Sequence, residues 1–291
     1  MAKVRDIETA VYSQSAGQCK GPASDTDVTE SKGRDVPGKI PVADAVRTPE
    51  DIGPNGRVFL TAEWRYLAIL NFEVDPALLA PRIPPGTELD TFDGRAFISL
   101  VGFRFLDTKV HGISIPFHRN FDEVNLRFYV RRRESGAVKR GVVFIQEIVP
   151  RRAVAAVARW VYHENYRRLP MSHQLTREGT TLRVEYAWRL VGRWNRLAVS
   201  ATGEPSEIAE GSLHQFIAEH YWGYCAQPGG GTVEYRVAHP PWRIWNAVES
   251  NFTGDSEALY GREFSAVLSR PPDSAFLSEG SPVAVFAGNK L

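Results

Sequence analysis

Polar and apolar residues alternate along residues 121–132, which predicts a β-strand with one polar and one apolar face. The apolar face carries Val124, Leu126, Phe128 and Val130. The polar face carries Glu123, Asn125, Arg127 and Tyr129. Any strand that exposes one face to solvent shows the same alternation, so the pattern alone does not separate a functional polar face from a solvated one.

A second strand is predicted over residues 142–148, and its end is acidic. Strict alternation places Glu147 on one face with Val143 and Ile145. Burial at the end of an apolar row raises the pKa of a carboxyl unless a cation or hydrogen-bond donors face it. Glu147 is therefore a candidate functional residue.

Two arginines follow this strand at the start of a predicted helix. Pro150 precedes Arg151 and Arg152, and the Ala- and Val-rich segment after them is predicted to be helical to about Arg168. Proline suits a first helical turn, whereas arginines there are repelled by the positive end of the helix dipole. We expect an anion nearby, which could be Glu147, Glu123, or a bound carboxylate or phosphate.

The rest of the chain divides at about residue 57. Residues 1–56 are polar, have no sustained periodicity and are predicted to be a mobile N-terminal extension. Residues 57–291 are predicted to be a single α+β domain, strand-dominated, with two or three helices packed on an antiparallel or mixed barrel-like sheet. Asp75 and Pro76 are typical of a helix start, and Ser212 with Gln215 forms a capping-box sequence for a helix to about Tyr221. Further strands are predicted over residues 58–74 (as a pair), 95–106, 181–191, 195–202, 232–238 and 243–248.

Composition excludes several classes of protein. A net charge of +1 and 43% hydrophobic residues in 291 favour a globular protein without nucleic acid or an anionic membrane as partner. Cys19 and Cys225 form neither a disulfide framework nor a CxxC site, and no apolar run is long enough for a membrane span. We expect a soluble, cytoplasmic protein.

Short catalytic motifs are missing from the sequence. No GxGxxG, GxxxxGK[ST], GxSxG or HExxH occurs, and no two histidines have a spacing of three or four residues. We expect no metal and no cofactor, although His118, Glu123 and His220 could form a metal site from separate elements.

The segment EHYWGY, residues 219–224, allows two interpretations. His220 continues an apolar helical stripe and could simply complete a core. Alternatively, Trp222 and Tyr224 could form the wall of a pocket and offer hydrogen bonds to a ligand.

Several long motifs resemble the YqjF-like bacterial family, a family of unknown function grouped with the acetoacetate decarboxylase superfamily. They are RVFLTAEWR (57–65), PFHRNFDEVNLRFYV (116–130), EIVPRR (147–152), EHYWGY (219–224), HPPW (239–242) and PPDSAFLSEGSPVAV (271–285). The resemblance covers residues 57 to 288. It implies an acetoacetate decarboxylase-like fold, a curved β-barrel or double sheet around a partly closed pocket.

The resemblance also implies two site residues and one departure. Arg65 is similar to the arginine of the first long strand, and Glu123 to the strand carboxylate. Where decarboxylases of that superfamily carry two lysines, this chain has Arg151 and Arg152. A guanidinium cannot supply the free amine for an imine, so Schiff-base decarboxylation is not predicted.

We therefore predict a binder or enzyme for a small, carboxylate-bearing organic acid, with Glu123 and Glu147 as acid or base if the protein is a lyase or isomerase. The predicted ligand-binding residues are Arg65, His118, Asn125, Arg127, Arg151, Arg152, Trp222 and Tyr224. The alternative is a non-catalytic sensor or interaction domain in which the Arg/Glu cluster is structural. A binder needs a cavity beside these charges, whereas a structural cluster uses every arginine nitrogen internally. An oligomer is compatible with either.

Overall fold

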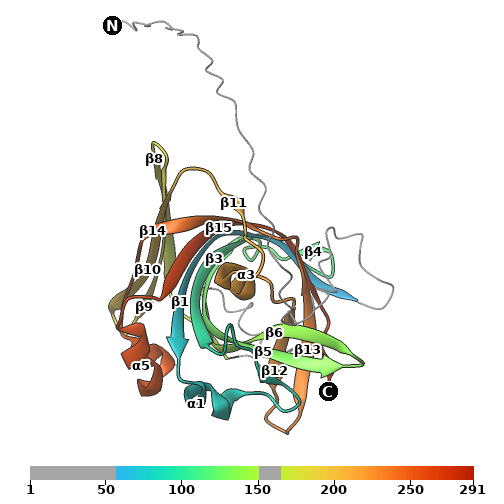
Figure 1. Ribbon diagram of the computed structural model, residues 1–291. Helices are drawn as coiled ribbons and strands as arrows, with labels where there is room; N and C mark the ends of the chain where they lie inside the picture. The colour runs from blue at the N-terminus through green and yellow to red at the C-terminus, as the bar shows by residue number, and fades with distance from the viewer. Residues whose placement is uncertain (1–56, 151–164) are drawn as a thin grey trace, which may run out of the picture. The chain divides into compact units, whose positions relative to one another are not determined.

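Long β-strands rich in β-branched and aromatic residues dominate the fold (Figure 1). The computed structural model describes residues 57–150 and 165–291, all of which belong to one compact unit, Val42–Leu291. The predicted extension over residues 1–56 lies outside the described residues, and the single domain over residues 57–291 stays a prediction.

The elements have the following bounds. The strands are β1 Val58–Val74, β2 Glu88–Leu89, β3 Ala96–Val110, β4 Ile113–Ser114, β5 Phe121–Glu134, β6 Ala137–Val149, β7 Tyr166–Arg168, β8 Met171–Glu178, β9 Thr181–Leu190, β10 Arg193–Thr202, β11 Ser206–Glu207, β12 Trp222–Ala226, β13 Thr232–Ala238, β14 Arg243–Thr253, β15 Ser274–Phe286 and β16 Asn289–Lys290. The helices are α1 Pro76–Leu79, the 3-10 turn η2 Ala80–Arg82, α3 Leu213–Ala218, α4 Ser256–Tyr260 and α5 Arg262–Leu268.

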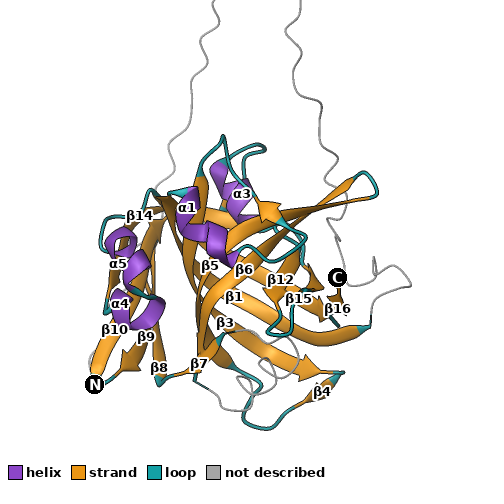
Figure 2. Cartoon of the chain, turned by 90° about the horizontal axis from the view of Figure 1, so that it is seen from below, coloured by secondary structure: helices purple, strands orange, loops and turns teal. Residues whose placement is uncertain are grey.

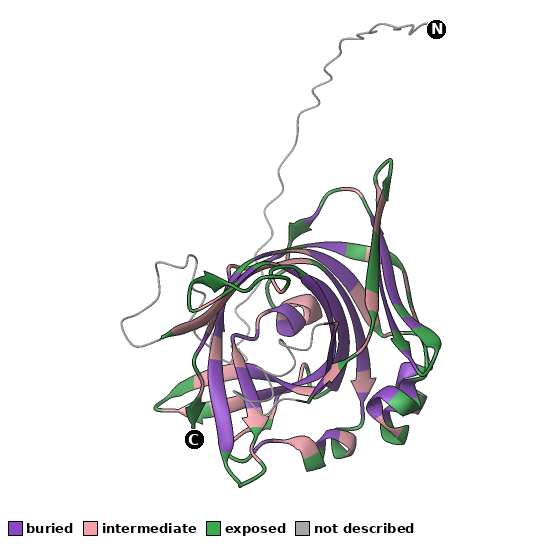
Figure 3. Cartoon of the chain, turned by 180° about the vertical axis from the view of Figure 1, so that it is seen from behind, coloured by how far each residue is buried: buried purple, intermediate pink, exposed green. Residues whose placement is uncertain are grey.

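The strand pairings form a closed ring. In the order β13, β12, β6, β5, β3, β1 and β15, each strand pairs with the next, and β15 pairs back with β13 through Val237 opposite Val285 and Ala238 opposite Ala284. Strands β14, β10, β9 and β8 continue the sheet from β15. Figure 1 shows the ring strands curving around α3, and Figure 3 shows that the strands lining the inside are largely buried.

Each face of the ring packs in its own core. The outer face of β1, β3 and β5 packs with β9, β10 and α5 through residues such as Leu70, Leu126, Trp188 and Phe264. Figure 2 shows α4 and α5 beside β9 and β10. The inner face packs with α3 through a second cluster that includes Ile69, Phe103, Tyr129, Phe216 and Ile217. The sheet therefore separates two hydrophobic layers, which explains why its strands are so apolar.

Helices α1 and α3 begin at the capping residues that the sequence predicts. The Asp75 carboxylate accepts a hydrogen bond of 2.9 Å from Ala77 N–H, with Pro76 at the first position of α1. The Ser212 hydroxyl accepts from Gln215 N–H at 3.2 Å, so the predicted cap of α3 is confirmed. The Gln215 side chain accepts from Gly211 N–H instead of completing the box at Ser212. Helix α3 ends at Ala218, earlier than predicted.

Three predictions of secondary structure were wrong or incomplete. The helix predicted to run to Arg168 is wrong at its end, because residues 166–168 form β7, which pairs in parallel with β6; residues 151–164 lie outside the described ranges. Residues 58–74 form one strand instead of a pair. Strands β8, β12 and β15, the short strands β2, β4, β11 and β16, and helices α4 and α5 were not predicted. The prediction of a strand-dominated α+β fold is confirmed. Within the described ranges, no helix is long and apolar enough to cross a membrane.

Candidate functional site

A cavity lies inside the ring of strands, between the sheet and α3. Its volume is about 160 Å³, comparable to the ~150 Å³ apolar cavity that accommodates benzene in an engineered protein. Most of its wall is apolar and includes Val101, Phe103, Phe105, Phe144 and Ile217. A cavity of this size and lining suits a small molecule with an apolar body.

The polar face of β5 forms one part of the cavity wall. Glu123, Asn125 and Arg127 all line the cavity, and each is at most 8% exposed. The opposite face of β5 lies in the outer core, as the alternation predicts. The polar face of this strand is therefore buried inside the ring instead of being exposed to solvent.

Glu147 reaches the same wall because β6 contains an irregularity. Asn125 pairs with Glu147 and Leu126 with Gln146, but Arg127 pairs with Phe144, so one residue of β6, Ile145, has no partner in the register. Such a bulge moves the following side chains to the other face. Glu147 therefore lines the cavity with Phe144, and the prediction that it shares a face with Val143 was wrong, since Val143 lies in the outer core.

Glu123 organises the hydrogen bonds in this wall. Its carboxylate accepts a bond of 3.0 Å from Asn125 Nδ2 and a longer one of 3.5 Å from the Tyr166 hydroxyl. Because a carboxylate only accepts hydrogen bonds, the amide nitrogen of Asn125 must face Glu123. The amide oxygen, Oδ1, is therefore the atom that does not bond to Glu123. Asn125 Oδ1 is buried and, among the described residues, has no hydrogen-bond donor.

Arg127 is a buried cation with few partners. Its Nη2 donates over 3.5 Å to the Ile217 carbonyl, and its guanidinium lies 5.8 Å from the centre of the Tyr129 ring. Its Nε is buried and has no hydrogen-bond partner within residues 57–150 and 165–291. In the described part of the chain, no acidic side chain forms an ion pair with it. A buried charge without an ionic partner is costly, so an anion in the cavity would be stabilised here.

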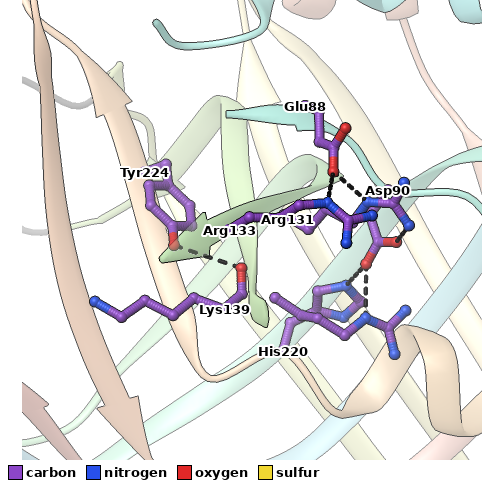
Figure 4. A network of polar contacts seen from close by, with 8 residues as sticks. Glu88, Asp90, Arg131, Arg133, Lys139, His220 and Tyr224 are labelled. Carbon is purple, nitrogen blue, oxygen red and sulfur yellow. Dashed lines mark hydrogen bonds and ion pairs between the residues drawn. The ribbon is translucent and has the colours of Figure 1, made fainter. Parts of the chain in front are cut away.

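His220 connects the cavity wall to a polar network at its edge. The His220 Nε2 atom lies 3.4 Å from Asp90 Oδ2, and the same carboxylate accepts a 2.6 Å bond from Arg140. Figure 4 shows this network, in which Glu88 bridges Arg131 and Arg133 close by. Burial lowers the pKa of His220 to about 4, so its ring is neutral at pH 7. Burial alone would raise the pKa of Asp90, but the contacts with His220 and Arg140 outweigh burial and lower this pKa to about 2.

His239 is a cavity residue that the sequence analysis missed. It is 3% exposed, its ring stacks on Trp242 at 4.4 Å with an interplanar angle of 16°, and its Nδ1 lies 2.9 Å from the Pro240 carbonyl. Burial lowers its pKa to about 4, a hydrogen bond to Pro240 opposes this, and the charge of Arg127 adds to the lowering. The motif HPPW was a signal for this residue, because it sets a histidine beside a tryptophan and two prolines between predicted strands.

The structure brings most of the predicted site residues together. The set that lines the cavity is Glu123, Glu147, His118, Asn125, Arg127 and Trp222. Arg151 and Arg152 lie outside the described residues.

Two predicted residues do not reach the cavity. Tyr224 packs in the outer core, where its hydroxyl donates over 3.5 Å to the Lys139 carbonyl. Arg65 pairs with Glu63 and donates to the Gly280 carbonyl at 3.3 Å. At Tyr66 the backbone has a φ of 56°, and the register of β1 shifts there. Because of this irregularity, Trp64 and Leu67 on either side line the cavity, whereas Arg65 does not.

The described residues offer no cluster of three His, Cys, Asp or Glu side chains arranged to hold a metal ion, so His118, Glu123 and His220 do not form one. Within the same ranges, no lysine lines the cavity, and the sequence of residues 151–164 contains none. The side chains that face the cavity can therefore offer carboxylates, a guanidinium, imidazoles and an amide to a ligand.

Solved structures share this architecture. Acetoacetate decarboxylase from Legionella pneumophila superposes with a TM-score of 0.55 at 13% sequence identity, covering 80% of this chain and 87% of that one. The enduracididine biosynthesis enzyme MppR, in its complex with pyruvate, superposes with a TM-score of 0.58 at 14% identity, covering 84% and 94%. These likenesses confirm the acetoacetate decarboxylase-like fold that the resemblance implied.

The sequence itself matches proteins without an assigned activity. The uncharacterized protein YqjF of Bacillus subtilis (strain 168) is 25% identical over 198 residues, which is 67% of this chain and 78% of that protein. The family DUF2071, described as an uncharacterized conserved protein, matches residues 61–282. The chain thus has the acetoacetate decarboxylase-like fold and belongs to the DUF2071 family.

Proposed function

We propose that the cavity binds a small organic acid whose carboxylate pairs with Arg127 and whose apolar part lies against the aromatic wall. The observation that carries this proposal is the state of Arg127, which is buried beside an apolar cavity and has no ionic partner among the described residues. A carboxylate would supply charge-assisted hydrogen bonds to nitrogen atoms that the protein leaves unused.

The apolar wall limits the size of this acid. A volume of about 160 Å³ holds only a few carbon atoms beyond a carboxylate. Aromatic side chains such as Phe103 and Phe105 offer such a chain a water-free surface. Two structural neighbours agree with this ligand class by their names, since one is an acetoacetate decarboxylase and the other was crystallised with pyruvate.

If the bound acid is turned over, Glu123 or Glu147 acts as the acid or base. Both carboxylates line the cavity, and both are at most 3% exposed. A carboxylate at this position can move a proton at a carbon next to a carbonyl, as in enolisation, hydration or dehydration. An imine mechanism has no support, because no described lysine lines the cavity.

The alternative of a purely structural cluster makes a different prediction. A structural arginine uses its nitrogen atoms on protein acceptors and leaves no space beside it. Here Arg127 Nε has no acceptor among the described residues, and the side chain of Arg127 lines the cavity. These two observations favour a ligand over a structural role for Arg127.

A thermal-shift series with a matched arginine control tests the proposal. The wild type is screened with short keto, hydroxy and unsaturated acids, and the best ligand is then tested on R127M, R127K and R133M. Arg133 lies on the same strand but is exposed and pairs with Glu88, so R133M controls for the loss of an arginine from β5. A ligand at 100 times its Kd adds about 2.7 kcal/mol, which corresponds to a rise in Tm of roughly 5–10 °C for a domain of this size.

The expected result is a shift in the wild type and in R133M, a smaller one in R127K, and none in R127M. Circular dichroism of each variant shows whether it is folded. If no acid stabilises the wild type, or if folded R127M keeps the full shift, the proposal is wrong.

A further inference from the structure

Among the residues that the structure describes, two acceptor atoms of cavity-lining side chains have no donor. The first is Asn125 Oδ1, whose identity is fixed because the other end of the amide donates to the Glu123 carboxylate at 3.0 Å. It is buried and, within the described ranges, no group donates to it. An amide oxygen buried without a donor costs about 1–3 kcal/mol, but this oxygen has almost no surface open to the cavity, so a ligand does not reach it.

The second acceptor is Nε2 of His239. The partner of Nδ1 is the Pro240 carbonyl at 2.9 Å, and a carbonyl can only accept, so Nδ1 must carry the proton. In a neutral ring this leaves a lone pair on Nε2, at the tip of the side chain. His239 lines the cavity, and no protein group in the described part of the chain bonds to Nε2.

The protonation state of His239 follows from its surroundings. The ring is 3% exposed and stacks on Trp242, with Tyr221 at 4.9 Å. Burial and the nearby Arg127 charge lower its pKa, so at neutral pH the ring stays uncharged and accepts a hydrogen bond at Nε2.

We propose that the ligand is a hydroxy acid: its carboxylate pairs with Arg127, and its hydroxyl group donates to His239 Nε2. This inference rests on the proposed function and adds the second group of the ligand to it. The Arg127 guanidinium and His239 Nε2 are then both used by one small molecule, with its apolar remainder against the aromatic side chains.

A hydroxyl fits this acceptor better than an ammonium group does. His239 Nε2 is neutral, and a neutral donor satisfies it without bringing a second charge out of water. An ammonium would also need a carboxylate, and Glu123 already accepts hydrogen bonds from Asn125 and Tyr166. A ligand with no donor would leave His239 Nε2 unsatisfied, and sites of this kind reject such analogues strongly.

The test compares acids that differ in a single group. Dissociation constants are measured by calorimetry at pH 7 for hexanoate, 2-hydroxyhexanoate, 3-hydroxyhexanoate and 3-aminohexanoate on the wild type, H239F and H239Q. We expect one hydroxy acid to bind the wild type on the order of 10–100-fold more tightly than hexanoate. H239F keeps an aromatic ring on Trp242 but has no acceptor, so the preference should fall to a few-fold while hexanoate binding stays within a few-fold. H239Q, whose amide oxygen can accept, should keep part of the preference.

A spectroscopic measurement follows the same contact without a variant. In ¹⁵N NMR, Nε2 of His239 should have the shift of an unprotonated nitrogen, and this shift should move when the hydroxy acid binds but not when hexanoate binds.

The outcomes separate the two proposals. If none of the four acids binds the wild type, the proposed function itself fails. If hexanoate binds as tightly as both hydroxy acids, or the amino acid binds most tightly, the hydroxy-acid inference is overturned while the binding of organic acids stands. If folded H239F keeps the full preference and the Nε2 signal does not move, His239 is not the acceptor.

Discussion

Burial of neutral His239 should make the protein sensitive to mild acid, and replacing this one residue should remove a measurable part of that sensitivity. The pKa of His239 is lowered from 6.5 to about 4, mainly by burial. Between these two pH values the unfolded chain holds a proton at His239 that the folded chain does not hold. The free energy of unfolding therefore decreases as the pH falls, by up to about 1.4 kcal/mol per pH unit for this group.

The size of the effect follows from the two pKa values. Between pH 7 and pH 4.5, the linkage relation gives a loss of roughly 2–3 kcal/mol from His239 alone. Other groups, including His220, contribute their own pH dependence, but they do so in the wild type and in H239F alike. The difference between the two proteins at the two pH values therefore isolates His239, whatever H239F does to stability at pH 7.

Urea unfolding followed by far-UV circular dichroism at pH 7.0 and pH 4.5 measures this difference. Tryptophan fluorescence is less suitable, because His239 stacks on Trp242. We expect H239F to lose roughly 2–3 kcal/mol less than the wild type between the two pH values. H111N serves as a control, because His111 is exposed and asparagine tolerates its positive φ of 50°. Equal losses in the wild type and H239F would refute a buried neutral His239.

Three further substitutions test parts of the fold that position the site, each by urea unfolding at pH 7. G280A should lower the free energy of unfolding by several kcal/mol, because a Cβ there would lie 1.9 Å from a main-chain oxygen of β1. G136A is the control: Gly136 has a similar positive φ but open space around it, so this variant should lose only about 1 kcal/mol. Equal losses would contradict the steric argument. S212A removes the cap of α3 and should lower the free energy of unfolding by about 1 kcal/mol. An unchanged free energy would show that the hydrogen bond from Gln215 N–H does not stabilise the protein. Y186F removes a 2.8 Å bond to the Tyr66 carbonyl at the kink of β1 and should lower the free energy of unfolding by about 1–3 kcal/mol; an unchanged value would show that this bond does not stabilise the kink.

Local patterns predicted most of the long strands and the two faces of β5. The alternation along β5 predicted which side chains share a face, and the structure confirms it, because the side-chain period of a strand is set by its own backbone. The caps at Asp75 and Ser212 were equally local and are confirmed. These features depend on residues only a few positions apart.

Irregularities within strands were beyond the sequence patterns. The face of Glu147 depends on a bulge at Ile145, and the placement of Arg65 depends on the kink at Tyr66. Both are set by pairing with other strands: Gly280 lies opposite Arg65, and Arg127 opposite Phe144. A single unpaired residue reverses every side chain that follows it, so a pattern that is right for most of a strand can still place its last functional residue on the wrong face.

Whether the polar face of β5 is solvated depends on contacts far apart in the sequence. The alternation is the same in an open sheet and in this ring, but the pairing of Val237 and Ala238 with β15 closes the ring and α3 fills part of its interior. Closure changes the energetics of the same residues: an arginine in an open sheet is hydrated, whereas Arg127 inside the ring has lost water without gaining an ionic partner in the described chain. Such a position destabilises the empty protein, and a bound anion would relieve this cost. The closure of the ring, which rests on contacts far apart in the sequence, is therefore also the feature on which the proposed binding of an organic acid depends.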